Sequence, residues 1–291
     1  MTNAPIPEIV LPAPVARSFS NLASELGGLE KSEAMALDRT LLMDLERTPG
    51  WTEFSSAIRD LWVDHDHVVI RGLPHPDDGT CLIFATLALG SDFKSYRGSR
   101  VVKQFTMSPW TTALSHTLAE GHFHTDLNTA ASPPRITAIH CVTPDPSAPH
   151  AGEVRIARLR DLIALLEESA ASTTLDFLRE TVVTMVNDSD AGAFRGRIVE
   201  GNEIRFHPET LRAAQRRLHE NPDGMEEHLE IIKSAAMRVS TPIHLFPGDA
   251  VLVSNTRALH YRGACTVRFR RFPRDFESRS VNVLHLRDEP Q

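Results

Sequence analysis

The segment GHFHTDLNTAASPP, residues 121–134, places two histidines and one aspartate within five positions. On an extended strand, residues two apart point to the same face, so His124 and Asp126 could bind one metal ion. His122 has the same parity, and the strand alone leaves open which histidine is used. Two histidines and one carboxylate form the facial triad of non-haem Fe(II) sites, which keeps other coordination positions open. A second histidine must then come from elsewhere in the chain; the alternative is a polar loop without a metal.

The best second histidine is His260, in GDAVLVSNTRALHYRGA. It follows a Pro-Gly-Asp turn and an apolar strand, so it should emerge at a strand end. Asp126 and His260 are 134 residues apart, which requires a fold that returns C-terminal strands beside N-terminal ones. A jelly roll does this. We interpret His244 and His285 as core or strand-face residues, and the following histidines as a solvated rim: His65, His67 and His75.

Composition restricts the classes of partner. The formal net charge of -7 leaves no basic excess to neutralise phosphates, so we expect no nucleic-acid partner. Cys81, Cys141 and Cys265 are an odd number without CxxC spacing, which predicts reduced thiols rather than disulfides or a zinc knuckle. No window approaches the roughly 18 apolar residues of a membrane span. We therefore expect a cytoplasmic protein without a membrane partner, which could form a homo-oligomer.

The elements that must position these residues are many short strands with helices between them. This pattern predicts a mainly β fold with flanking helices around a double-stranded β-helix, or jelly-roll, core. We expect a flexible proline-rich N-terminus over 1–14, then one domain over 15–291 with a lid near 185–203. Helices are expected over 31–46, 51–63, 79–89, 158–170, 208–220 and 222–237. Strands are expected over 66–74, 100–107, 121–126, 135–143, 153–157, 181–187 and 196–206, and in four C-terminal segments, 241–246, 249–255, 266–272 and 280–286.

Three segments resemble one known family. HTDLNTAASPP resembles the HTD and Pro-Pro segment of the taurine dioxygenase and clavaminate synthase-like Fe(II)/2-oxoglutarate oxygenases. DHVVIRGLP resembles the strand before that family's first core helix. GDAVLVSNTRALHYRGA resembles the region around its distal metal histidine. The motifs occur in the family's order, and the resemblance runs from about residue 66 to 287.

The resemblance implies a 2-oxoglutarate-dependent dioxygenase with iron bound by His124, Asp126 and His260. Its cofactors would be Fe(II), 2-oxoglutarate and O2. It also implies an arginine that pairs with the far carboxylate of 2-oxoglutarate, a task that suits the planar guanidinium. The candidates, in order, are Arg279, Arg274 and Arg271. The chain departs from the family at AGEV, where Val154 takes the place of a threonine whose hydroxyl bonds the cosubstrate.

The resemblance also implies a small-molecule substrate, an amino acid or its derivative in secondary metabolism, which is hydroxylated, desaturated or cyclised. The carboxylate of Asp126 fills the position that related halogenases leave to a halide, so we expect no halogenation. Candidate substrate contacts are Arg195, Arg197, Gln104 and Arg257. Two alternatives are a non-catalytic cupin-like metal-binding protein and a metallohydrolase using His122, His124 and Asp126.

Overall fold

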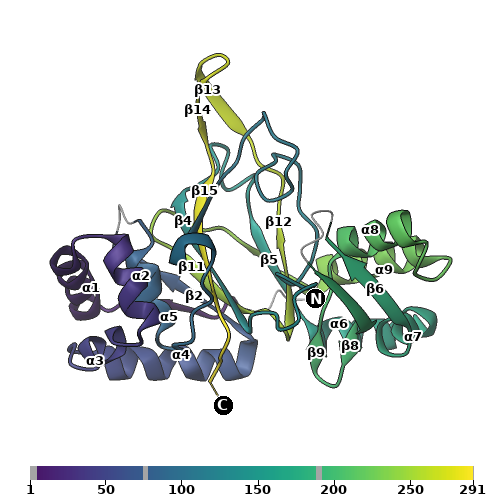
Figure 1. Cartoon of the computed structure of the whole chain (residues 1–291), viewed down its shortest axis with the longest axis horizontal. Coiled ribbons are helices and arrows are strands. Elements are labelled where there is room, and N and C mark those ends of the chain that lie inside the picture. The colour runs from purple at the N-terminus through teal and green to yellow at the C-terminus, as the bar shows by residue number, and fades with distance from the viewer. Residues whose placement is uncertain (1–4, 75–77, 188–191, 291) are drawn as a thin grey trace.

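The computed structural model describes residues 5–74, 78–187 and 192–290. Within these residues, two β-sheets face each other between two groups of helices (Figure 1). The larger sheet has the strand order β1-β2-β11-β4-β15-β3, and the smaller has the order β10-β5-β12. The predicted jelly-roll core with flanking helices is confirmed.

The strands of the larger sheet are β1 (Glu8–Val10), β2 (His67–Arg71), β11 (Ala250–Ser254), β4 (Ile136–Thr143), β15 (Ser280–Leu286) and β3 (Lys103–Thr106). Those of the smaller sheet are β10 (Pro242–Ile243), β5 (Val154–Arg158) and β12 (Ala258–Arg262). Three hairpins stand apart: β6 (Val182–Val186) with β7 (Ala193–Arg197), β8 (Val199–Glu200) with β9 (Glu203–Ile204), and β13 (Val267–Arg271) with β14 (Asp275–Ser278). The helices of the first group are α1 (Ala13–Leu26), α2 (Leu29–Leu37), α3 (Leu41–Leu45), α4 (Trp51–His65) and α5 (Thr80–Thr86). Those of the second are α6 (Leu159–Glu168), α7 (Ser172–Arg179), α8 (Pro208–Leu218) and α9 (Met225–Val239).

Strand β11 illustrates why the larger sheet is buried on both faces. Ala250 and Leu252 point to the core shared with the first group of helices. Val251 and Val253 point the other way, into the core between the two sheets. Alternate residues of a strand face opposite sides, so one apolar run serves both layers.

The two helical groups bury separate cores on opposite sides of the sheets (Figure 1). In the first, Phe19 contacts the rings of Trp51, Phe54 and Phe84 at centroid distances of 5.5–6.4 Å. In the second, α6, α7 and α9 pack with the β6–β7 hairpin and with Leu259 and Tyr261 of β12. Helices thus pack against the sheets on both sides. None of the described helices is long and apolar enough to cross a membrane.

The N-terminus departs from the prediction of a flexible segment over 1–14. Residues 8–10 form β1, which pairs in parallel with β2, and α1 follows directly. The amide of Leu11 also donates to the carbonyl of Arg71. The hydrogen-bond partners of β1 are backbone groups at the edge of β2. The local sequence of residues 1–14 does not show that this edge is available. Residues 1–4 lie outside the described part.

Three further predictions are wrong in detail. The single strand expected over 196–206 divides into the end of β7, β8 and β9. The helix expected over 31–46 divides into α2 and α3, because Arg39 has a left-handed backbone with φ 59°. The strand expected over 121–126 is irregular, with a single bridge between His124 and His260. The chain turns at once after Asp126, where Leu127 has φ 53°. The lid predicted near 185–203 covers the end of β6 together with β7 and β8; residues 188–191 lie outside the described part, and the lid stays a prediction.

Candidate metal centre

Three side chains from distant parts of the sequence meet at the inner face of the smaller sheet. His124 pairs with His260 of β12 through two backbone hydrogen bonds of 3.0 and 3.1 Å. The nearest ligand atoms of His124, Asp126 and His260 all lie within 4.8 Å of one another. Among the described residues, this is the group of histidine, cysteine and carboxylate side chains arranged to hold an ion. These are the three residues that the sequence assigned to the metal.

Hydrogen bonds orient the ring of His124. Its Nδ1 lies 2.8 Å from the carbonyl oxygen of His122, so Nδ1 carries the proton and donates. Its Nε2 is then directed at Asp126 Oδ1, 3.4 Å away. The Nε2 of His260 lies 3.5 Å from Oδ2 of the same carboxylate. The ring nitrogens thus converge on one carboxylate, as the ligands of one ion must.

The electrostatics suit a cation. Burial opposes ionisation of Asp126, but the neighbouring imidazoles hold the pKa of its carboxyl well below its usual range. Burial also lowers the pKa of His260, which favours the neutral imidazole that a metal requires. The Nδ1 of His260 is buried and has no hydrogen-bond partner among the described residues. A carboxylate with two histidines is the donor set of a facial triad, and these residues fit an iron ion.

Asn255 holds the aspartate in place through the backbone. Its Oδ1 accepts a 2.6 Å hydrogen bond from the Asp126 amide, and its Nδ2 donates to the Asp126 carbonyl. The same Nδ2 donates to the carbonyl of Pro134, at the start of β4. One side chain after β11 therefore fixes both ends of the turn that follows HTD. Sequence reasoning gave Asn255 no role in the site, although it stands in the NTR motif before His260.

A cavity of about 150 Å³ lies next to the three candidate ligands, between the two sheets. Its wall is mostly apolar. The residues that line it, apart from the ligands, are Phe105, Met107, Ser115, Thr137, Ile139, Val154, Tyr261, Arg262, Arg279, Val281, Val283 and His285.

Two arginines line this cavity: Arg262, which hydrogen-bonds the carbonyls of Gly263 and Ala119, and Arg279, which is only 5% exposed. Arg279 has no such partner: its guanidinium has no ion pair or hydrogen bond to any described residue. Gly152, whose φ is 72°, lies beside it: a Cβ at that residue would be 2.8 Å from Asp145 Cβ and 3.3 Å from Arg279 Cδ. Buried charges are almost always paired, so this guanidinium is suited to an anionic ligand. Gly152 is a contributor that sequence reasoning missed, although it belongs to the AGEV segment.

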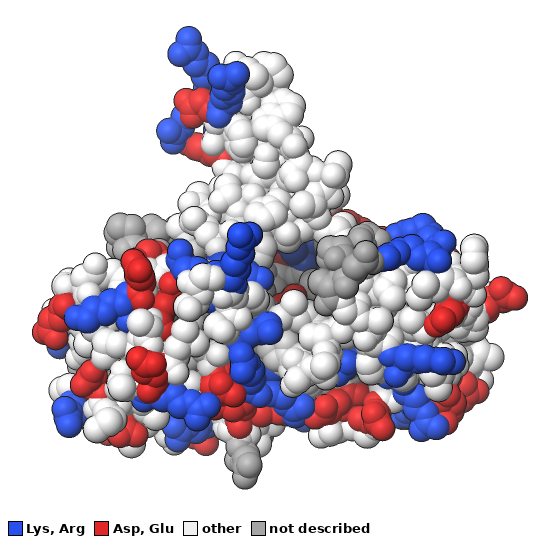
Figure 2. Space-filling view, viewed as in Figure 1, with Lys and Arg blue, Asp and Glu red and all other residues white. Residues whose placement is uncertain are grey.

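Arg271 and Arg274 lie elsewhere. Both are exposed and belong to the β13–β14 hairpin, which projects from the body of the molecule (Figure 1). Figure 2 shows basic and acidic side chains together at the tip of this projection. Neither arginine lines the cavity. An exposed guanidinium is already solvated and gains less from a carboxylate than a buried one does.

The other candidates lie outside the cavity wall. His122 Nε2 lies 3.3 Å from Glu209, and Arg257 pairs with Asp66 and Glu289. Arg195, Arg197 and Gln104 are exposed. His207, which sequence reasoning missed, caps α8 and lies with its ring 4.8 Å from that of His124.

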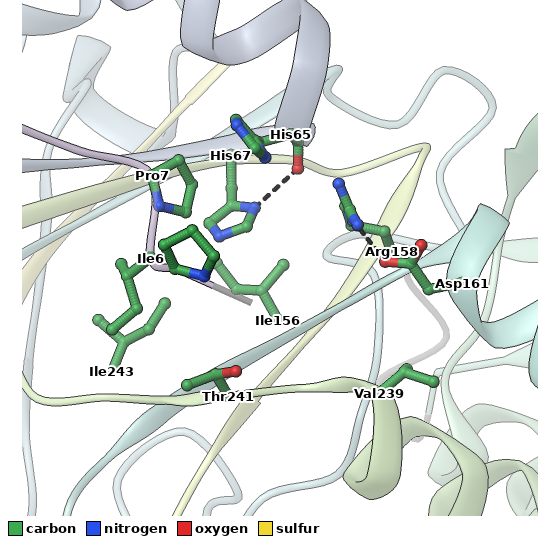
Figure 3. A pocket seen from close by; sticks show the side chains of 11 residues that line it. Ile6, Pro7, His65, His67, Ile156, Arg158, Asp161, Val239, Thr241 and Ile243 are labelled. Atoms are coloured by element: carbon green, nitrogen blue, oxygen red, sulfur yellow. Dashed lines mark hydrogen bonds and ion pairs between the residues drawn. The ribbon is translucent and has the colours of Figure 1, made fainter. Parts of the chain in front are cut away.

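A second, smaller cavity of about 80 Å³ lies beside the N-terminal segment (Figure 3). His67, which we expected on a solvated rim, lines it and hydrogen-bonds the carbonyl of His65 at 2.8 Å. Burial lowers the pKa of His67 to about 4, so the ring is neutral. Arg158 and Asp161 pair with each other at the wall, 2.5 Å apart. His67, Arg158 and Asp161 therefore leave no unpaired charge in this cavity for a ligand to bind. His75 lies outside the described residues.

The chain matches one family model and is similar in fold to solved structures. Residues 47–272 match the family model "Taurine catabolism dioxygenase TauD, TfdA family". An asparagine oxygenase, solved in complex with Fe(II), 2S,3S-3-hydroxyasparagine and succinate, is 17% identical, with a TM-score of 0.72 over 96% of this chain and 93% of that chain. The non-heme iron oxygenase OrfP, in complex with Fe and alpha-ketoglutaric acid, is 16% identical, with a TM-score of 0.67 over 97% of this chain and 94% of that chain. No curated protein sequence matches the chain.

Proposed function

The chain belongs to the taurine catabolism dioxygenase TauD, TfdA family, and from that premise we propose that it hydroxylates an amino acid or a close derivative. The predicted enzyme class, a 2-oxoglutarate-dependent non-haem iron dioxygenase that uses Fe(II) and O2, is confirmed by this membership. The alternatives of a metallohydrolase and of a non-catalytic cupin-like protein are not supported. The cytoplasmic location, the absence of a nucleic-acid partner and a homo-oligomeric state stay predictions.

The observation that carries the assignment of roles is the buried guanidinium of Arg279 in the same cavity as the candidate ligands. His124, Asp126 and His260 would hold the iron, and Arg279 would hold the far carboxylate of 2-oxoglutarate. Bound iron supplies the oxidising chemistry, by reacting O2 with the cosubstrate. Arg279 contributes a fixed positive charge, and the low-dielectric wall around it strengthens its attraction for a carboxylate. The apolar side chains of β3, β4 and β15 exclude water from the reacting groups.

The carboxylate of Asp126 distinguishes hydroxylation from halogenation in this proposal. It would occupy the third protein ligand position. Thr137 donates a hydrogen bond to its Oδ2, and the Asn255 side chain holds the backbone of Asp126 through the amide and the carbonyl. No such position is left for a halide. We therefore propose a hydroxylated product; desaturation and cyclisation are other outcomes of the same chemistry.

An amino-acid substrate is supported by the solved neighbours, which were determined with hydroxyasparagine, arginine and hydroxyarginine. Within this chain, Lys103 offers a cation for a substrate carboxylate. It lies on β3 two residues before Phe105 of the cavity wall and pairs in register with Val283, so its side chain shares their face. No described residue forms an ion pair with its ammonium group. The ammonium group makes a cation–π contact with Tyr96, and Nζ lies 3.4 Å from the centroid of that ring.

The experiment that tests the function is a screen for 2-oxoglutarate turnover. Purified protein with Fe(II) and ascorbate is given each of the twenty L-amino acids, their α-carboxamides and small organic acids, and succinate release is measured. We expect slow turnover without substrate and stimulation by one or a few free amino acids. The carboxamides should stimulate less, because they lack the charge that a lysine would bind. Absence of succinate release under every condition would contradict the proposal.

Val154 allows a sharper test of the cosubstrate pocket. It lines the cavity together with Arg279, at the position where the family resemblance places a threonine. Val154→Thr should lower the KM for 2-oxoglutarate about tenfold, since a hydrogen bond to a charged group contributes about 1.5–3 kcal/mol. Val154→Ala, which removes the methyl groups without adding a hydroxyl, is the control and should not lower it. A KM for Val154→Thr at or above that of the wild type would place this residue away from the cosubstrate.

A further inference from the structure

His285, which we interpreted as a core or strand-face residue, is buried on a strand face and also lines the cavity beside the candidate ligands. It is 5% exposed and lies on β15, where Val281 and Val283 share its face and line the same cavity. Its cross-strand partner on β4 is Thr137. Directly opposed side chains of two strands lie on one face of the sheet, so these two residues approach a common point.

That common point is one oxygen of the candidate iron ligand. His285 Nε2 lies 3.0 Å from Asp126 Oδ2, and Thr137 Oγ1 lies 2.9 Å from the same atom. Oδ2 therefore accepts two hydrogen bonds from the larger sheet. Oδ1 makes neither of these two contacts and lies 3.4 Å from His124 Nε2, whereas His260 Nε2 lies 3.5 Å from Oδ2.

Tyr96 fixes the proton on His285. Its hydroxyl hydrogen-bonds His285 Nδ1, and the two rings lie edge to face with their centroids 5.9 Å apart. The carboxylate oxygen Asp126 Oδ2 can only accept, so His285 Nε2 donates to it, and Nδ1 of a neutral ring is left to accept from the Tyr96 hydroxyl. The proton of the neutral imidazole is therefore on Nε2, which faces the aspartate.

We propose that His285, oriented by Tyr96, is a positioning residue that holds Asp126 Oδ2 and so presents Oδ1 to the metal. The inference rests on the proposed function, because it takes Asp126 as an iron ligand. Without these donors the carboxylate could rotate about its terminal bond or turn both oxygens to the ion. Groups that orient a metal ligand typically change metal affinity by roughly 10- to 100-fold when they are removed.

The test measures metal affinity without catalysis. Metal-free protein is titrated with Co(II), with binding followed by visible absorption, in the absence of 2-oxoglutarate and substrate. His285→Ala should bind Co(II) roughly 10- to 100-fold more weakly than the wild type. His285→Gln, whose amide can still donate, should recover part of the loss. Tyr96→Phe, which frees the imidazole to change tautomer, should weaken binding less than His285→Ala.

The matched control is Leu284→Val. Leu284 neighbours His285 on β15 but points to the opposite face, into the core of the first helical group. It should lower thermal stability and leave Co(II) affinity unchanged. Wild-type Co(II) affinity in His285→Ala would overturn the inference; if that variant does not fold, equal affinity of His285→Gln, Tyr96→Phe and wild type would do so. Failure of the wild type itself to bind Co(II) would instead overturn the proposed function, and the inference with it.

Discussion

Replacing Asp126 with alanine is expected to abolish metal binding and 2-oxoglutarate turnover. The carboxylate is the one negative charge of the three-residue group, and its loss leaves two buried imidazoles to hold a cation. Because removing even a supporting residue costs roughly 10- to 100-fold in affinity, loss of a ligand should weaken Co(II) binding by more than about a hundredfold. Succinate release should fall to the background without enzyme. Co(II) titration and succinate release check the two effects separately.

A matched control for this variant is Asp161→Ala. Asp161 pairs with Arg158 beside the smaller cavity and does not line the cavity beside the three ligands. Its replacement should leave both Co(II) affinity and succinate release close to those of the wild type. Turnover retained in Asp126→Ala would show that the HTD segment does not bind the catalytic metal.

Replacing Arg279 with methionine is expected to raise the KM for 2-oxoglutarate by about two orders of magnitude or more. Truncating one partner of a buried, hydrogen-bonded charge pair costs about 2–5 kcal/mol. Arg279→Lys should recover only part of this, because an ammonium cannot bind a carboxylate with two parallel hydrogen bonds. Co(II) affinity should be retained, since Arg279 has no contact with the ligand atoms in the structure. The KM is measured from succinate release with saturating Fe(II).

Arg279→Met should weaken 2-oxoglutarate binding but should not lower the thermal stability of the protein. In the protein without 2-oxoglutarate, Arg279 is a buried charge with no described partner, and a buried unpaired charge is unfavourable. Arg279→Met should therefore melt no lower than the wild type, while 2-oxoglutarate should raise the melting temperature of the wild type alone. Arg271→Met and Arg274→Met, on the exposed hairpin, should behave as the wild type in both assays. A raised KM in Arg274→Met with a normal KM in Arg279→Met would move the role to the hairpin.

Much of the fold follows from local patterns. The apolar runs of β4, β11 and β15 and the amphipathic segments of α6, α8 and α9 were all predicted at nearly their observed bounds. These elements are regular over several residues, and their periodicity reflects the layer that each face contacts. The missed elements include β1, α1, α7, β12 and β14, and the strands among them are short and, apart from β14, depend on distant partners. Strand β1, for example, exists because the edge of β2 accepts it.

The sequence by itself determined the candidate ligands. His124 and Asp126 stand two apart, and His260 stands in a motif whose order and context resemble those of one family. It did not determine why the side chains converge, since the predicted strand over 121–126 is in fact a single bridge followed by a turn. That geometry depends on Asn255, which is 129 residues away from Asp126 and bonds it through both amide atoms.

Only the tertiary structure distinguishes the surroundings of the three arginines and shows which groups His285 contacts. Arg271, Arg274 and Arg279 lie within nine residues of one another, and sequence spacing ranks them only weakly. What separates them is burial: two lie on a projecting hairpin, and the third lies on the wall of the cavity. From the sequence, His285 is only a histidine on a predicted strand. The pairing of β15 with β4 places it opposite Thr137. Residue type is local, whereas the dielectric, the partners and the direction of a side chain depend on segments far away in the chain.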